Sequence, residues 1–384
     1  MVKVSDNNIK FLIGEKSLEN LAYEIRLAGC DKPMLVCDDM ARRLGYKSIL
    51  LKSFDGTDTN INYIDHTIGD IATTNDCERI VKEFIKSASD CLILLGKKAV
   101  MSAGKISKIM LCEGELSVAE YEGKDLSVSE VKKIPMFVVP TNYASGIECS
   151  NKVRIYSPDF KTIYQFDSTY AQSDVVVCDS RMTDITPPKA VASYGLYALA
   201  MAVDGYVKSG DSLYTKPYAL TAIEILKEHL IKGILKVADK EHRREIMSAV
   251  VIAGCGYYQL EKNFLAVLSD VISDRYKVNQ ANVMAILFRH YIRHASADDR
   301  EVLSQLRVCF DEDEGEDDAQ VVLDRIEKIY CEIDEAVNYN SCLGDFNISK
   351  SDFASIAEET IAAADVKSEE LSYSFIINLL EESY

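Results

Sequence analysis

The sequence predicts an α/β domain with a parallel sheet, followed by a domain made only of helices. Short apolar runs alternate with helical patterns through residues 1–182, which is typical of parallel strands joined by crossover helices. Beyond about residue 186 the pattern consists of long helices alone. The chain of 384 residues also exceeds the roughly 100–200 residues of one typical domain. We therefore expect two domains, at residues 1–182 and 183–384.

The strands of the first domain are predicted from continuous apolar segments. Three such segments occur at residues 33–37, 91–95 and 134–140. The first ends at Asp38 and the second at Gly96, and a helical pattern over residues 79–85 precedes the second. Alternation over residues 153–166 predicts a hairpin. Ligand sites in such α/β domains lie at the carboxyl ends of the strands, so we expect a domain of the dinucleotide-binding type.

The second domain is predicted from helical periodicity. Thr186 is the expected N-cap of a helix with Pro187 in its first turn, and residues 191–203 are apolar nearly all round, as in a helix buried among helices. Further helical patterns cover residues 216–236, 241–260, 279–293, 319–337, 350–364 and 372–382. The acidic segment 311–318 is expected to be a solvated loop. Calcium binding there is an alternative, although the spacing departs from the twelve-residue calcium loop.

Composition excludes several classes of partner and site. The chain has 43 basic and 61 acidic residues and a net charge of −18, which disfavours nucleic acid and anionic membranes. The N-terminus has no signal core, and no apolar run approaches the ~20 residues of a membrane span. Eleven cysteines without a CxxC pair predict a reducing cytoplasm and inert core thiols. Cys149 lies in a glycine-containing turn and is the cysteine for which a reactive thiol stays under consideration.

Only five histidines are present, at positions 66, 229, 242, 290 and 294. His229 and His242 fall in amphipathic helical patterns with charged neighbours, so we expect them to face solvent. His290 and His294 are four residues apart on one predicted helix. That spacing suits a metal, but the adjacent arginines favour a solvated face.

Four segments in order carry a family resemblance. They are LVCD at 35–38, LGKKAVMSAGK at 95–105, PTNYASGIE at 140–148 and GLYALAMAVDGY at 195–206. They resemble the ribose-binding strand end, the GGGSxxDxxK loop, the PTTxGTGSE loop and the GxDALxHAxEAY helix of the iron-containing (group III) alcohol dehydrogenases. That family has the dehydroquinate-synthase-like fold, and the resemblance covers essentially the whole chain. It implies NAD or NADP as cofactor and a homo-oligomer, most simply a dimer.

The resemblance assigns a set of candidate cofactor-binding residues. A carboxylate at a strand end accepts hydrogen bonds from ribose hydroxyls, and glycines let backbone N–H groups approach a pyrophosphate. In the glycine loop this chain keeps Gly96, and Lys97 and Lys98 replace family glycines. The lysine side chains occupy the space that glycines leave open, but their charge attracts phosphate. The family's acidic position in that loop is Ser102. The candidates are Asp38, Gly96, Lys97, Lys98, Thr141, Asn142, Ser145 and Lys161.

The family's metal ligands are replaced in this sequence. The family holds a divalent ion with one Asp and three His, and the resemblance places these positions at Tyr197, Met201, Leu265 and Asn279. A further family histidine falls at Ser269. A phenol, a thioether, an alkyl group and a carboxamide cannot balance a hard dication. No histidine lies between 242 and 290, so a shifted alignment does not restore the site. We therefore expect neither iron nor zinc.

Two functional hypotheses follow. The first is a metal-free pseudoenzyme with a structural, regulatory or ligand-binding role. The alternative is a metal-independent, NAD(P)-dependent oxidoreductase acting on a small alcohol or aldehyde. Tyr197 is then the candidate proton donor, since a phenol can serve as a general acid, although a buried packing role suits this residue better. In a third hypothesis Lys97 and Lys98 bind a different phosphorylated ligand.

Overall fold

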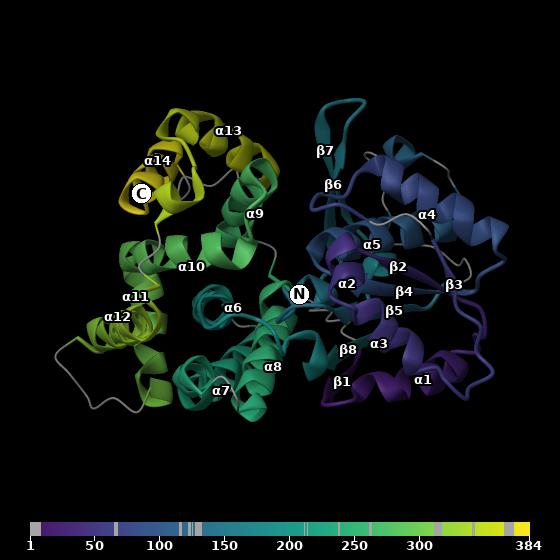
Figure 1. Ribbon diagram of the computed structural model, residues 1–384. Coiled ribbons are helices and arrows are strands. Elements are labelled where there is room, and N and C mark those ends of the chain that lie inside the picture. The colour runs from purple at the N-terminus through teal and green to yellow at the C-terminus, as the bar shows by residue number, and fades with distance from the viewer. Residues whose placement is uncertain are drawn as a thin grey trace. The chain divides into compact units, whose positions relative to one another are not determined.

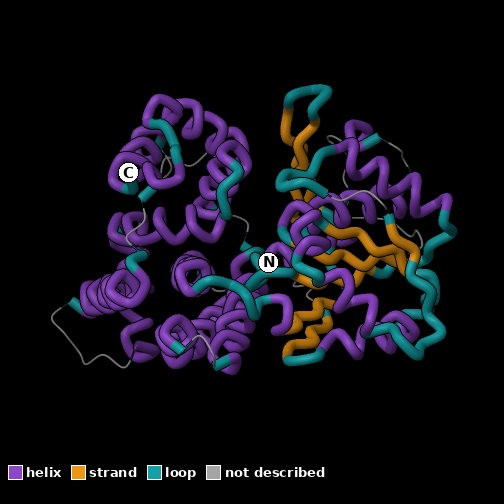
Figure 2. Tube along the Cα trace, in the orientation of Figure 1, coloured by secondary structure: helices purple, strands orange, loops and turns teal. Residues whose placement is uncertain are grey.

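The computed structural model divides the chain into two compact units, Met1–Ile185 and Thr186–Tyr384 (Figure 1). The first is an α/β unit and the second contains only helices, which confirms the predicted fold class (Figure 2). The structure describes residues 9–64, 68–114, 117–121, 124, 126, 133–210, 212, 214–236, 239–260, 263–310, 317–339, 342–364 and 372–384. His66 and acidic residues 311–316 lie outside this set.

A parallel six-stranded sheet forms the centre of the first unit, in the order β1-β8-β5-β4-β2-β3. Its strands are β1 (Lys10–Gly14), β2 (Pro33–Cys37), β3 (Asn62–Tyr63), β4 (Cys91–Gly96), β5 (Met136–Pro140) and β8 (Val175–Asp179). Every residue of β2, β4, β5 and β8 is buried. Burial on both faces explains why these strands are continuous apolar runs in the sequence. The first two predicted strands are confirmed, and the third begins at Met136.

Among its described residues, the first unit also contains five helices and several short 3-10 segments. The helices are α1 (Leu21–Leu27), α2 (Asp39–Arg43), α3 (Tyr46–Lys52), α4 (Thr74–Lys86) and α5 (Lys98–Glu113). The 3-10 segments are Ser17–Asn20, Val118–Tyr121, Ile147–Cys149, Thr169–Ala171 and Ser180–Met182. The helical pattern expected at 79–85 belongs to α4, which begins with a capping box between Thr73 and Asp76.

A separate antiparallel hairpin follows the sheet's fifth strand. It consists of β6 (Lys152–Ser157) and β7 (Thr162–Asp167), which confirms the hairpin expected at 153–166. Val153, Ile155 and Ser157 are buried while Tyr156 is exposed, the alternation of a strand with one solvent-facing side.

The second unit contains nine helices within its described residues. They are α6 (Pro188–Lys208), α7 (Thr215–Leu235), α8 (Lys240–Tyr257), α9 (Phe264–Tyr276), α10 (Gln280–Tyr291), α11 (Ala297–Ser304), α12 (Asp318–Val337), α13 (Phe353–Ala364) and α14 (Tyr373–Glu382). Short 3-10 segments lie at Ile292–His294, Gln305–Phe310, Leu343–Phe346 and Lys350–Asp352. The predicted helical patterns are confirmed within a few residues at each end, whereas α9 and α11 were not predicted.

Helix α6 is the centre of the helical unit. Its residues 191–207 are all buried, and it contacts α7, α8 and α10. Among the described residues it is the one helix long and apolar enough to cross a membrane by composition, and 94% of its most apolar window is buried in the protein. Burial of this kind is what a core helix requires, since apolar side chains all round the helix need packing partners on every side.

Two local predictions are wrong. Thr186 does not cap α6: the N-cap is Pro187, and the Thr186 carbonyl accepts a hydrogen bond from Arg243 Nη1 at 3.0 Å. His229 and His242 do not face solvent: their Nδ1 atoms lie 2.8 Å apart, and each side chain is only 14% exposed. Eight of the eleven cysteines are buried, as expected of core thiols.

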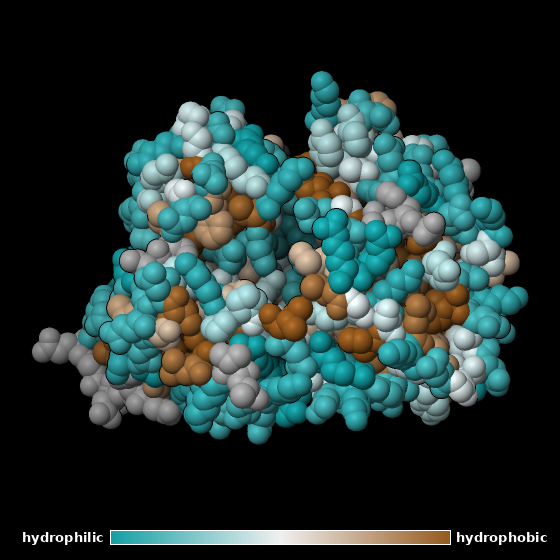
Figure 3. Space-filling view, viewed as in Figure 1, coloured by the Kyte–Doolittle hydropathy of each residue, from teal (hydrophilic) through white to brown (hydrophobic). Residues whose placement is uncertain are grey.

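Hydrophilic residues cover most of the face drawn in Figure 3, in keeping with the net charge of −18. Large apolar side chains that reach solvent are spread over several elements, for example Tyr23 on α1, Ile85 on α4 and Tyr214 before α7.

Candidate functional site

Four of the predicted cofactor residues meet at the carboxyl edge of the sheet. Strands β2, β4 and β5 are neighbours, with Gly96 paired to Pro140 at their carboxyl ends. The Asp38 Oδ2 atom accepts a hydrogen bond from the Lys97 backbone N–H at 3.0 Å. The Thr141 N–H donates to the Gly96 carbonyl at 3.1 Å. Parallel strands place their carboxyl ends at one edge, which is why residues distant in sequence converge here.

Asp38 is held firmly by the chain itself. Its Oδ1 atom caps α2 by accepting from the Ala41 N–H at 2.6 Å, and the residue is only 6% exposed. Burial raises the pKa of the Asp38 carboxyl, although the N–H groups of Ala41 and Lys97 oppose the shift. Because each carboxylate oxygen has two lone pairs, both oxygens can still accept a second hydrogen bond. Asp38 is therefore a positioned acceptor with limited access.

Gly96 is required by packing as well as by resemblance. A Cβ atom there would lie 2.5 Å from Val100 Cγ2 and 2.7 Å from Asp38 Oδ2, so neighbouring side chains already fill the space above the glycine. Helix α5 starts two residues later. Its N-cap is Lys97, whose side chain makes no capping hydrogen bond, and its first turn contains no acidic residue. Lys97 and Lys98 are both half-buried at this positive helix end.

The loop after β5 carries three more candidates. The Thr141 Oγ1 atom is buried and has no hydrogen-bond partner among the described residues. Asn142 is half-buried, and Ser145 donates from its N–H to Glu148 Oε2 at 3.1 Å. Ala144 adopts a left-handed backbone with φ of +67°. An unpartnered buried hydroxyl costs free energy unless something else bonds it, so Thr141 is the candidate with the clearest capacity for a ligand.

Lys105 is a residue whose role the sequence did not reveal. Its side chain is completely buried, and Nζ donates to the carbonyls of Ile147 and Ser150, both at 2.6 Å. Burial lowers the pKa of Lys105 to about 7. Burial likewise raises the pKa of the nearby Glu148 carboxyl. Lys105 thereby fixes the 147–150 loop. The sequence feature that could have identified this residue is its match to the lysine that ends the family's GGGSxxDxxK loop.

Lys161 is placed differently from the other candidates. It lies in the exposed turn of the β6–β7 hairpin, with φ of +52°, rather than at the end of a sheet strand. Its predicted contact with a cofactor stays a prediction.

The resemblance places the family's metal ligands at four positions, all of which lie in the helical unit. Tyr197 and Met201 are one turn apart on α6, Leu265 is in the first turn of α9, and Asn279 is the N-cap of α10. Helix α10 packs against both α6 and α9. Tyr197, Met201 and Leu265 are at most 1% exposed.

These side chains are engaged with the protein. The Tyr197 and Tyr258 hydroxyls lie 3.1 Å apart. Asn279 accepts from the Ala281 N–H at 2.9 Å and donates from Nδ2 to the Tyr194 hydroxyl at 2.6 Å. One amide oxygen, one phenol and one thioether supply no anionic or imidazole ligand, so this donor set does not fit iron or zinc.

Two further buried groups lie in the same unit. Ser269, at the position of the additional family histidine, is fully buried and donates to the Ala266 carbonyl at 2.9 Å. Asp204, on α6, accepts from the Tyr257 hydroxyl at 2.9 Å and is 2% exposed. Burial raises the pKa of Asp204 to about 6. Sequence reasoning did not single out this carboxyl.

Within the described residues, one cluster of three metal-ligating side chains occurs, and it lies in the other unit. It consists of Cys30, Asp90 and Cys91, at the amino-terminal ends of strands β2 and β4. No such cluster includes Tyr197, Met201, Leu265 or Asn279 among the residues that the structure describes.

Comparison with known proteins identifies related sequences. The long-chain-alcohol dehydrogenase 1 of Geobacillus thermodenitrificans is 22% identical over 290 residues, or 74% of this chain and 72% of that protein. The lactaldehyde reductase of Escherichia coli is 23% identical over 286 residues, or 73% of this chain and 72% of the reductase.

Solved structures share the fold across the whole chain. A 1,3-propanediol oxidoreductase superposes with a TM-score of 0.84 at 17% identity, covering 98% of both chains. The sulfoacetaldehyde reductase of Bifidobacterium kashiwanohense, solved in complex with NAD+, gives 0.82 at 16% identity, covering 100% of this chain and 99% of the reductase.

The two units match two family descriptions in turn. Residues 8–180 match "Iron-containing alcohol dehydrogenase", and residues 191–384 match "Fe-containing alcohol dehydrogenase family, C-terminal". The chain therefore belongs to the iron-containing alcohol dehydrogenase family.

Proposed function

We propose that this protein is a metal-free member of its family. The observation that carries the proposal is the donor set at Tyr197, Met201, Leu265 and Asn279, which offers no carboxylate and no imidazole. Met201 and Leu265 are fully buried and offer only a thioether and an alkyl group at their positions. Without a Lewis acid, the family's usual means of polarising the alcohol oxygen is lacking.

Similarity to other proteins favours an oxidoreductase that uses NAD or NADP on a small alcohol or aldehyde, and the donor set described above makes it metal-independent in this proposal. The relatives are named as dehydrogenases and reductases, and one structural neighbour was solved with NAD+. The carboxyl-edge residues fit a nucleotide chemically, because Thr141 Oγ1 is a buried hydroxyl without a partner among the described residues. When bound, NAD(P) supplies the ring that gives or takes hydride.

The chain's own groups would then act as follows. Asp38 accepts hydrogen bonds from ribose hydroxyls, and Lys97 and Lys98 attract the phosphates. The Tyr197 phenol holds the proton that a carbonyl substrate takes up, and the Tyr258 hydroxyl at 3.1 Å shares it. The proposal rests on this pairing of two hydroxyls in the helical unit.

The second candidate is a non-catalytic, ligand-binding or structural protein. It is favoured by the simultaneous change at four ligand positions and in the glycine loop, where Lys97 and Lys98 replace glycines. A protein of this kind would keep the carboxyl-edge site for NAD(P) or for another phosphorylated ligand.

Binding and turnover, measured separately, distinguish these candidates. Titration with NADH and NADPH is followed by turnover assays on a panel of small alcohols and aldehydes. Turnover identifies the oxidoreductase, whereas binding without turnover, or no binding at all, supports the non-catalytic candidate. Tyr197→Phe should abolish any turnover. Tyr206→Phe, on the same helix as Tyr197, removes a hydroxyl that donates to Gln305 and should leave turnover unchanged. A stoichiometric metal in the wild type that Asn279→Ala removes would overturn the metal-free proposal.

We also propose a cytoplasmic homodimer without nucleic-acid or membrane partners. The net charge of −18 supports the exclusion of anionic partners, and light scattering at a monomer mass would contradict the dimer.

A further inference from the structure

Two cysteines and an aspartate meet at the amino-terminal edge of the sheet. Cys30 lies in the loop between α1 and β2, and Asp90 directly precedes Cys91, the first residue of β4. Pro33, the first residue of β2, pairs with Cys91. Since β4 has six residues, this place is about 16 Å along the strand from Gly96 and the candidate nucleotide site.

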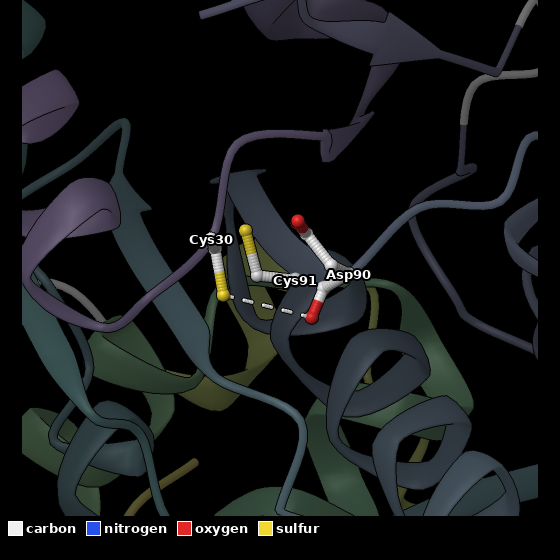
Figure 4. A group of neighbouring side chains, drawn as sticks. All are labelled: Cys30, Asp90 and Cys91. Carbon is white, nitrogen blue, oxygen red and sulfur yellow. Dashed lines mark hydrogen bonds between the residues drawn. The ribbon is translucent and has the colours of Figure 1, made fainter.

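The three side chains converge on one point (Figure 4). The two sulfur atoms and a carboxylate oxygen all lie within 4.8 Å of one another. Tetrahedral zinc with Zn–S distances of about 2.3 Å needs two sulfurs about 3.8 Å apart. The Cys30 and Cys91 sulfurs would therefore have to approach each other by about 1 Å at most. Cys91 is fully buried and Cys30 is 6% exposed, which shields the point from bulk water.

Backbone groups fix the carboxylate. Asp90 Oδ2 accepts from the Asp31 N–H at 2.8 Å and from the Lys32 N–H at 3.1 Å. The Cys30 sulfur also lies 3.7 Å from the Ala28 carbonyl and 3.8 Å from the Asp90 carbonyl, the contact drawn as a dashed line in Figure 4. Hydrogen bonds that orient a ligating carboxylate are typical of metal sites, where they hold the ligand in its binding geometry.

We propose that Cys30, Asp90 and Cys91 bind a thiophilic divalent cation of the zinc type. Two sulfur ligands select against magnesium and calcium, which prefer oxygen, and favour zinc. Three protein ligands leave a fourth position for water or for one of the neighbouring carbonyls. The bound ion would tie the loop after α1 to the start of β4, two segments 60 residues apart in the chain. This site is separate from the family's metal positions, all of which belong to the helical unit.

Cobalt(II) titration of the reduced protein tests the proposal directly. One equivalent should produce the near-ultraviolet charge-transfer absorption of thiolate-bound cobalt, and zinc should remove it. Cys30→Ser and Cys91→Ser should abolish that absorption, and Asp90→Asn should weaken cobalt binding at least about tenfold. Cys331→Ser is the matched control, because Cys331 is exposed on α12 and should leave the titration unchanged.

A second measurement covers variants that fail to fold. In the wild type, zinc should protect Cys30 and Cys91, and not Cys331, from alkylation under partly denaturing conditions, as read by mass spectrometry. The proposal is overturned if reduced wild-type protein gives no thiolate–cobalt absorption, if that absorption survives in both serine variants, or if zinc leaves the alkylation pattern unchanged. A Cys30–Cys91 disulfide in protein that takes up no metal after reduction would likewise overturn it.

Discussion

The buried carboxyl of Asp204 should make stability depend on pH in a way that Asp204→Asn removes. Burial raises the pKa of this group from the ordinary 3.8 to about 6. At about 1.4 kcal/mol for each pKa unit, the difference corresponds to about 3 kcal/mol. Because the folded state binds the proton more tightly, this stability is fully present below pH 3.8 and is lost as the pH rises through about 6.

The amide that replaces the Asp204 carboxyl in this variant cannot ionise. It can still accept a hydrogen bond from the Tyr257 hydroxyl, which lies 2.9 Å from the wild-type carboxylate. We therefore expect the free energy of unfolding of Asp204→Asn, relative to wild type, to increase by about 2 kcal/mol between pH 4 and pH 7, the larger part of the full difference. Urea unfolding at several pH values, followed by a probe in the helical unit, measures the difference. Comparing the two proteins at each pH cancels the titration of all other groups.

Asp324→Asn provides the matched control, since Asp324 is an exposed carboxylate on α12 that accepts from Gln320 Nε2 at 2.8 Å. It controls for the loss of one negative charge in the helical unit. A constant difference between wild type and Asp204→Asn across this range would refute the reasoning, because it would mean that the carboxyl titrates alike in the folded and unfolded chains.

Three further substitutions test the carboxyl-edge site. Gly96→Ala places a methyl 2.5 Å from Val100 Cγ2 and should destabilise the first unit by about 1–3 kcal/mol in urea, with Val100→Ala partly restoring it. Ala144→Gly should stabilise the fold by about 1 kcal/mol in thermal unfolding, because φ at this position is +67°; an unchanged melting temperature would contradict that. Lys105→Met leaves the Ile147 and Ser150 carbonyls without their donor and should cost about 2–4 kcal/mol, and should expose the 147–150 loop to hydrogen exchange.

The strand ends were predictable from the sequence, whereas the long-range partners of individual side chains were not. Strands β2 and β4 are buried on both faces, so they appear as apolar runs ending in Asp38 and Gly96. Periodicity places a residue on a helix face but does not say what packs there. For that reason His229 and His242 looked solvent-facing, although α7 and α8 bring them together.

Motif comparison was similarly limited at the candidate site. It named Thr141 and Gly96 only as separate candidates, whereas the structure brings them side by side because neighbouring parallel strands end at one edge. It did not reveal that Lys105 holds the 147–150 loop, since that contact spans more than 40 residues. The pairing of Tyr197 with Tyr258 is also a product of tertiary packing, 61 residues apart in the chain.

The N-cap at Asn279 makes the proposed loss of metal hard to reverse. Its side chain starts α10 by accepting from the Ala281 N–H, and exchange of such a cap costs about 1 kcal/mol. Histidines in place of Met201 and Leu265 would put imidazoles in a core with no exposed surface at either position. Any single step back toward the family's ligand set is thus destabilising by itself, and a metal could offset the loss only after several positions had changed together. Under this proposal, the positions that serve chemistry elsewhere in the family contribute to folding in this chain.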